Sequence, residues 1–183
     1  MILSILIPTL PERKTLLERL IVSINPTEQV EILTDSRPRG ITTGEKRNDL
    51  LNRATGEYVC HVDDDDFVHN GYCREILSAL ESKPDCVTFE GWMTTNGIAK
   101  VDWIIKLGEK YEARQDTDGI TRYYRFPNHL AAIKTSISRK ARFPHVTQGE
   151  DYPWAKELND RGLIKTSVHI PKQLYHYDFH SNK

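Results

Sequence analysis

The chain has 183 residues, of which 38% are hydrophobic and 28% charged, a composition typical of a soluble folded domain. Its 25 Lys and Arg residues nearly balance 26 Asp and Glu residues, and the net charge of −1 provides no basic surface for nucleic acid. The three cysteines form no Cys-x-x-Cys pair. This argues against a disulfide framework or a thiolate zinc site and favours a reducing compartment.

The N-terminal stretch from Met1 to Ile7 is apolar but is stopped by Pro8, so it is too short for a signal peptide or a membrane span. No later stretch approaches the ~20 apolar residues that a spanning helix needs. We therefore expect a cytoplasmic protein without a membrane span.

The first half of the chain alternates short apolar runs with helical patterns of apolar residues. Strands are predicted at 3–7, 30–33, 58–62 and 86–89, and helices at 16–24, 45–53 and 72–80. This alternation predicts a mostly parallel, Rossmann-like sheet flanked by helices, with ligands bound beyond the carboxyl ends of the strands. Thr9, Asp35 and the run Asp63 to Asp66 follow three of these strands, so they should line one crevice.

The second half is richer in β-structure. Asn96-Gly97 and Asp118-Gly119 are hairpin-turn dipeptides. Further elements are expected as strands at 120–126 and 166–170 and a helix at 152–161, followed by a tail rich in His and Tyr. No repeat or linker interrupts the chain, so we predict a single α/β domain over residues 1–183 with a smaller β-rich part.

Four consecutive aspartates follow the third predicted strand. Neighbouring carboxylates repel one another by up to about 1 kcal/mol in water, so the run favours a compensating cation. Asp63 and Asp65 point to the same side of an extended chain, which suits a divalent ion held by oxygen ligands. The alternative is a solvated loop or a helix cap, with Asp66 capping a helix that starts near Asn70.

Six motifs occur in one order over nearly the whole chain. They are Ser4-Ile-Leu-Ile-Pro-Thr9, Asp35, Lys46-Arg47-Asn48 with Ala54-Thr-Gly-Glu-Tyr58, Val62-Asp-Asp-Asp-Asp66, Gly149-Glu150-Asp151-Tyr152 and Leu174-Tyr-His-Tyr177. In this order they resemble the family 2 glycosyltransferases, which are inverting enzymes of the GT-A fold. The resemblance implies a nucleotide-sugar-binding half at 1–90 and a half at 91–183 that binds the acceptor and carries the catalytic base.

The resemblance also implies which residues bind the nucleotide of the donor, with Asp35 hydrogen-bonded to the base, usually a uracil. The nucleotide-binding set is Pro8, Thr9, Glu12, Arg13, Asp35, Lys46, Arg47, Asp63 and Asp64. For Lys46 and Arg47 a solvated helix face is the alternative.

A metal site is implied as well. Asp65, together with Asp63, would ligate Mn²⁺ or Mg²⁺. His176 would add an imidazole ligand, unless it and His180 belong to a tail packed by its tyrosines.

Asp151 is the expected catalytic base and Glu150 the expected neighbour that orients the acceptor or a loop. Asp151 also resembles a helix N-cap, a role compatible with a base. His129 could face the sugar, but we expect it to be a structural histidine. Trp92, Trp103 and Trp154 could stack on sugar rings, although such residues are more often core or edge packing, and Trp154 has the best claim among them.

The sequence thus predicts a metal-dependent hexosyltransferase that moves a sugar from a UDP-sugar to an acceptor hydroxyl by a single in-line displacement. The acceptor (a glycan, a protein or a small molecule) and a homo-oligomeric state stay open. One rival is a non-catalytic nucleotide- or sugar-binding module. A sugar nucleotidyltransferase is disfavoured, because the loop from Pro8 to Arg13 has no glycine to cradle a triphosphate.

Overall fold

The first strand, β1 (Leu3–Pro8), is buried along its whole length and points alternate side chains to opposite faces of the sheet. In the computed structural model, which describes residues 1–179, its odd-numbered side chains share a core cluster with α1 (Lys14–Ile24). On the opposite face, Leu6 packs with α2 (Thr43–Arg53). A strand that is apolar on both faces needs a helix on each side, and the sheet is covered in that way.

Most of the central strands of the sheet share one direction. β2 (Val30–Asp35) and β3 (Tyr58–His61) flank β1 in parallel. The short β9 (Ala132–Lys134) runs antiparallel between β3 and β5 (Cys86–Thr95), so β5 points the same way as β1. β10 (Ser167–Phe179) then pairs with β5 in parallel. The α/β class with a mostly parallel central sheet is therefore confirmed.

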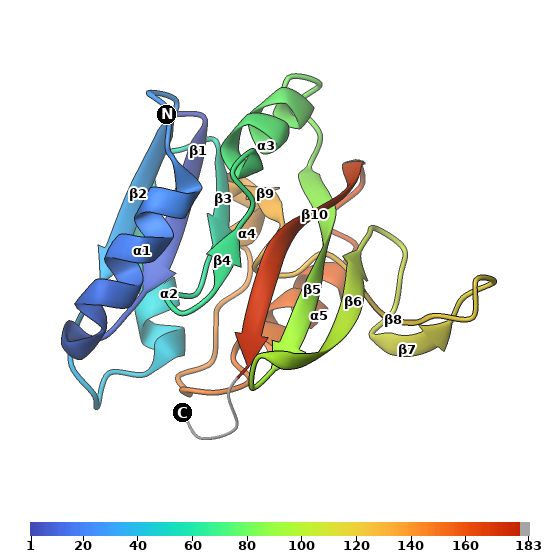
Figure 1. Ribbon diagram of the computed structural model, residues 1–183. Helices are drawn as coiled ribbons and strands as arrows, with labels where there is room; N and C mark the ends of the chain where they lie inside the picture. Colours follow the sequence, from blue (N-terminus) through green and yellow to red (C-terminus); the bar gives the residue numbers. More distant parts are fainter. Residues whose placement is uncertain (180–183) are drawn as a thin grey trace.

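Three further strands extend this sheet beyond β5. β6 (Ile98–Ile105) follows β5 through the predicted Asn96-Gly97 turn, whose residues have the positive φ values of 52° and 74°. β7 (Glu112–Gln115) and β8 (Thr121–Arg125) form a hairpin that projects from the body of the molecule (Figure 1). The hairpin turn expected at Asp118-Gly119 is also confirmed.

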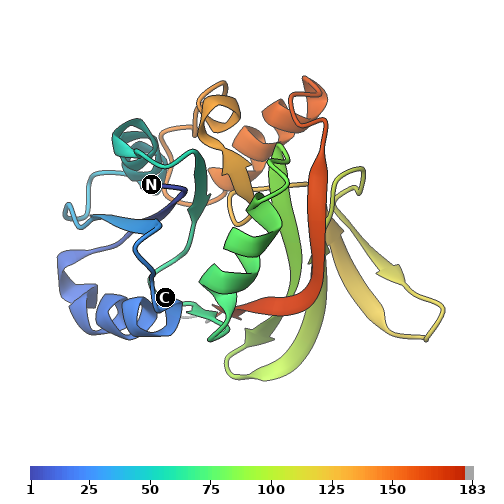
Figure 2. The same cartoon turned by 90° about the horizontal axis from the view of Figure 1, so that it is seen from above.

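The helices divide between the two faces of the sheet (Figure 2). α1 and α3 (Tyr72–Leu80) cover one face, whereas α2, α4 (Thr135–Ser138) and α5 (Asp151–Asp160) cover the other. A single 3-10 turn, η1 (Pro11–Arg13), leads from β1 into α1. Within residues 1–179, every helix is too short or too polar to cross a bilayer.

Several boundaries differ from the sequence-based ones. α2 begins two residues early because Thr42 and Glu45 form a reciprocal capping box. The fourth predicted strand continues to Thr95, so the expected boundary at residue 90 falls inside β5. The last predicted strand continues to Phe179 and includes most of the tail, because its residues pair with β5 along its length.

Gly91 in β5 offers a test of this packing. A Cβ atom there would lie 2.2 Å from the Trp103 ring and 2.5 Å from the carbonyl oxygen of Tyr175, and neither neighbour can move freely in the core. We expect Gly91→Ala to lower the free energy of unfolding by about 1–3 kcal/mol in chemical denaturation. Gly71→Ala is the matched control, because its nearest neighbour is the mobile end of Arg74 at 3.1 Å. Equal stability of the two variants would contradict the packing described.

Candidate functional site

Strand register brings polar residues together at the carboxyl edge of the sheet. Pro8 lies opposite Asp35, and the Thr9 amide donates to the Asp35 carbonyl at 2.9 Å. The Thr9 hydroxyl donates at 2.5 Å to Oδ2 of Asp64, which follows the neighbouring strand β3. The residues that follow these three strands therefore lie together at one edge of the sheet, and the crevice expected there stays a prediction.

Two arginines compensate much of the acidic run. Nη1 of Arg13 lies 2.8 Å from Oδ1 of Asp64 and 3.4 Å from Oδ2 of Asp65. Burial raises the pKa of Asp64 above its ordinary value, and the Thr9 and Arg13 hydrogen bonds offset only part of that rise. Arg13 therefore lies at the acidic run, as expected of a residue beside the donor site.

The second arginine, Arg47, lies in the interior and joins the two halves of the chain. Its Nε donates to Oε1 of Glu150 at 2.8 Å, and its Nη2 donates to Oδ1 of Asp63, also at 2.8 Å. Its side chain is only 3% exposed. Burial opposes the guanidinium charge, but the two carboxylates outweigh it and raise the pKa of Arg47. Arg47 is thus not on a solvated helix face, and Glu150 is held by an ion pair.

Asp66 does not cap a helix, because α3 begins at Tyr72 without a side-chain cap. Its carboxylate is buried and accepts from the Tyr175 hydroxyl at 2.6 Å and from the Asp178 amide at 3.0 Å. Burial and the nearby Asp63 charge raise the pKa of Asp66 well above its ordinary value. The fourth aspartate of the run is therefore hydrogen-bonded to β10 and does not face the solvent.

The structure does not bring His176 to the acidic run. Successive side chains of a strand point to opposite faces, and the neighbouring Tyr175 is the one that reaches the aspartates. His176 stacks instead between Phe67 and Trp92, with ring centroids at 5.6 and 5.0 Å. Its Nε2 lies 2.8 Å from the Thr94 hydroxyl.

The protein supplies only part of a metal-binding set. Within residues 1–179, no three His, Cys, Asp or Glu side chains are grouped to hold an ion. Asp63 and Asp65 remain 32% and 17% exposed, so their hard oxygen atoms can still ligate an ion alongside oxygens of a substrate. His180 lies outside the described residues.

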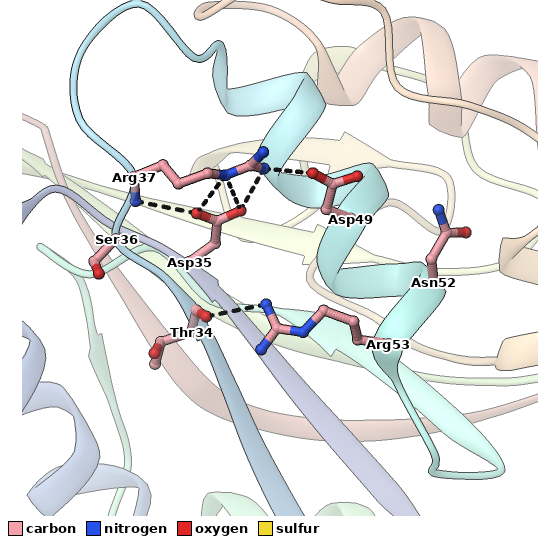
Figure 3. Close-up of a pocket in the computed structure, with 7 residues that line it drawn as sticks. All are labelled: Thr34, Asp35, Ser36, Arg37, Asp49, Asn52 and Arg53. Atoms are coloured by element: carbon pink, nitrogen blue, oxygen red, sulfur yellow. Dashed lines mark hydrogen bonds and ion pairs between the residues drawn. The ribbon is translucent and has the colours of Figure 1, made fainter.

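A shallow hollow of about 400 Å³ opens beside the end of β2 (Figure 3). Within this hollow Arg37 forms an ion pair with Asp35. Its Nε lies 3.0 Å from both carboxylate oxygens, and its Nη2 lies 2.6 Å from Oδ2. Burial would raise the pKa of Asp35, but the Arg37 hydrogen bonds prevail and lower it. The hollow is lined by Thr34, Asp35, Ser36, Arg37, Asp49, Asn52 and Arg53.

The other predicted nucleotide-binding residues surround this edge. Nζ of Lys46 is buried and donates to the carbonyls of Thr9 and Arg37, both at 2.6 Å, so it fixes the strand end against the Arg37 loop. Pro8 is the last residue of β1. Glu12 is at the surface, paired with Nε of Arg39 at 3.0 Å.

Asp151 is the first residue of α5 and makes no side-chain cap, so the N-cap reading is wrong. Its Oδ2 lies 3.3 Å from Nδ1 of His129, an ion-pair distance. Burial of Asp151 would raise its pKa, but His129 and then Arg47 outweigh it and hold the pKa well below the usual range. His129 is thus a buried residue in contact with Asp151, a contact that no local sequence pattern revealed.

Unpartnered buried nitrogen atoms gather behind Asp151. They are Nη1 of Arg47, both ring nitrogens of His61 and Nδ1 of His129, none with a hydrogen bond to any described residue. Burial and the Arg47 charge keep the pKa of His61 well below its ordinary value, so its ring is neutral. Such atoms are rare in folded proteins, and here they mark a polar interior able to bind water or a ligand.

Aromatic side chains that the sequence did not single out flank Asp151. Tyr111 packs on Phe126 and Tyr152, with ring centroids at 4.4 and 5.1 Å, and Tyr152 is 42% exposed. By contrast, Trp154 is buried and stacks on Phe143, so the expectation that favoured it for sugar stacking is wrong.

The other two tryptophans are also packed within the protein. Trp103 is buried in the core, and Trp92 lies against His176. The exposed aromatic surface beside Asp151 therefore belongs to tyrosines.

No family model and no curated protein sequence matches this chain. Solved structures do match: S. aureus TarS 1–349 in complex with UDP aligns with 97% of this chain and 60% of that chain, at a TM-score of 0.70 and 16% identity. S. aureus TarS 1–349 in complex with UDP-GlcNAc aligns with 97% and 58%, at a TM-score of 0.72 and 16% identity. The chain spans less than two thirds of the length of these structures. At this identity the likeness shows the fold alone, and it supports a glycosyltransferase fold.

The contact between His129 and Asp151 gives a pH-dependent prediction. Because His129 lowers the pKa of Asp151, His129→Gln should raise it, so that the carboxylate takes up its proton at higher pH than in the wild type. The measurement is a ¹³C NMR titration of the aspartate carboxyl groups, with Asp151 assigned by the signal lost in Asp151→Asn. A titration unchanged by His129→Gln would contradict the geometry.

Proposed function

We propose that this chain is a metal-dependent inverting glycosyltransferase that moves a sugar from a UDP-sugar to an acceptor hydroxyl. The observation that carries this proposal is the pair of 2.8 Å bonds by which Arg47 joins Asp63 to Glu150, the residue next to Asp151. These bonds hold the start of α5, and with it the ionised carboxylate of Asp151, close to the acidic run at the carboxyl edge of the sheet. The shared fold with TarS structures in complex with UDP and UDP-GlcNAc supports the choice of donor.

The donor nucleotide would lie along the ends of β1, β2 and β3. The hollow beside Asp35 would take the base, with Arg37 rearranging or sharing the carboxylate when a base donates to it. Thr9 and Arg13 hold Asp64 in place, which would present the acidic run to the ribose and diphosphate.

The chemistry would be a single displacement at the anomeric carbon. Asp151 takes the proton of the acceptor hydroxyl as that oxygen forms its bond to the anomeric carbon. The bond from that carbon to the diphosphate oxygen breaks on the opposite face, its electrons leave with UDP, and the anomeric configuration inverts. His129 and Arg47 keep Asp151 ionised, so its oxygens are free of a proton when the acceptor hydroxyl arrives.

A divalent ion would be held by Asp65 and Asp63 together with diphosphate oxygens. When bound, Mn²⁺ or Mg²⁺ would offset the negative charge that develops on the departing diphosphate. The geometry of His176 does not support a place for it in this set.

Asp151→Asn tests the catalytic assignment. It should abolish UDP release from UDP-GlcNAc in the presence of Mn²⁺ and an acceptor panel, because an amide cannot take the proton. It should leave UDP affinity, measured by calorimetry, within about twofold of the wild type, since Asp151 is assigned no donor contact. Asp160→Asn on the exposed end of the same helix is the matched control and should behave like the wild type.

Three outcomes separate the alternatives. Full turnover by Asp151→Asn would refute the base assignment. UDP binding without turnover of any donor by the wild type would favour the non-catalytic binding module. Absence of UDP binding, with or without Mn²⁺, would refute the donor site itself.

A further inference from the structure

Arg125 ends strand β8 at a place fixed by the sheet. Its backbone lies opposite Ile105 of β6, and its carbonyl accepts from the Lys106 amide at 2.9 Å. The half-buried guanidinium lies 5.9 Å from the ring centroid of Trp103 and 5.9 Å from that of Tyr111. Two aromatic faces thus hold the cation in position.

The Arg125 guanidinium makes no hydrogen bond or ion pair with any residue in 1–179. This distinguishes it from Arg13 and Arg47, whose charges are taken up by aspartate and glutamate. A guanidinium carries five N–H donors in a planar fork, and those of Arg125 stay available to a ligand. The aromatic faces accept no conventional hydrogen bond from them.

The two rings beside Arg125 contact further residues that lead to the acidic run and to the proposed base. On one side Trp103 packs on Tyr175, with ring centroids at 6.0 Å, and the Tyr175 hydroxyl bonds Asp66. On the other side Tyr111 packs on Tyr152, the residue after Asp151.

Electrostatics agree with this position. Burial raises the pKa of Tyr111 and of Tyr177 to about 12, and the Arg125 charge lowers both. The same two hydroxyls respond to carboxylates, Tyr111 to Asp151 and Tyr177 to the acidic run. The positive charge therefore lies close to two hydroxyls that also respond to Asp151 and to the acidic run.

We propose that Arg125 is an anion-binding residue of the transfer site that holds a phosphate or carboxylate group of a substrate. The proposal rests on the proposed function, whose donor and base it connects. The planar fork of a guanidinium matches both anions through two parallel hydrogen bonds. The anion has two sources, the terminal phosphate of the donor's UDP portion or an acidic group on the acceptor.

The test compares wild type, Arg125→Gln and Arg125→Lys by calorimetry in the presence of Mn²⁺. The probes are UDP, UMP and uridine for the donor, and inorganic phosphate added to the UDP-saturated protein for the acceptor side. Arg74→Gln is the matched control, because it removes the same charge from a side chain that is 81% exposed. Thermal unfolding of each variant verifies that it is folded.

If the donor supplies the anion, Arg125→Gln should weaken UDP about tenfold or more while uridine is unaffected, the loss expected for a charged hydrogen bond. If the acceptor supplies it, UDP affinity should be kept and phosphate binding lost, with Arg125→Lys retaining part of it. Equal affinities of wild type and Arg125→Gln for every probe would overturn the proposal.

The same titrations separate this proposal from the proposed function. Failure of the wild type to bind UDP would refute the donor site. In that case, inorganic phosphate is titrated into the protein without UDP. Loss of its binding in Arg125→Gln would support the anion site, and no difference would overturn it.

Discussion

The arrangement of the site depends on the two ion pairs made by the buried Arg47 guanidinium. This guanidinium carries its charge into the interior from α2 and is neutralised by Asp63 at the end of β3 and by Glu150 before α5. Removing one partner of a buried pair typically costs about 3–5 kcal/mol because the other charge is left uncompensated, so Arg47 requires these carboxylates beside it. As a result, Asp151 lies across from the acidic run even though about 90 residues separate them in the chain.

The four aspartates occupy four different environments. Asp63 pairs with Arg47, Asp64 with Thr9 and Arg13, and Asp66 with Tyr175, whereas Asp65 lies beside Arg13 with 17% of its side chain exposed. Protein cations and hydrogen-bond donors relieve part of the repulsion within the run, but the charges of Asp63 and Asp65 still raise the pKa of Asp66. Any metal ion added by the substrate would complete this neutralisation rather than create it.

Local patterns in the sequence predicted the elements of the first half and the gathering of polar residues at one edge, because apolar periodicity and strand order are properties of neighbouring residues. They indicated a strand at 131–133 but could not predict that this strand, β9, pairs between β3 and β5 through long-range contacts. The Thr42–Glu45 capping box is a local signal that was present but not used.

The missed features of the site have the same physical origin. His129 meets Asp151 only because β9 brings its neighbourhood beside β3, where the His61 amide bonds the His129 carbonyl at 2.8 Å. Whether Tyr175 or His176 faces the acidic run depends on a strand register that a change of one residue would reverse. Most of the site follows from topology, and topology is set by contacts that no short motif contains.

The most direct test of this account is a crystal structure of the chain with UDP and Mn²⁺. We predict UDP along the carboxyl ends of β1, β2 and β3, its diphosphate facing Asp65, with both Arg47 ion pairs intact and Asp151 open toward the terminal phosphate. UDP bound away from this edge, or Asp63 and Glu150 separated from Arg47 in the complex, would contradict the account.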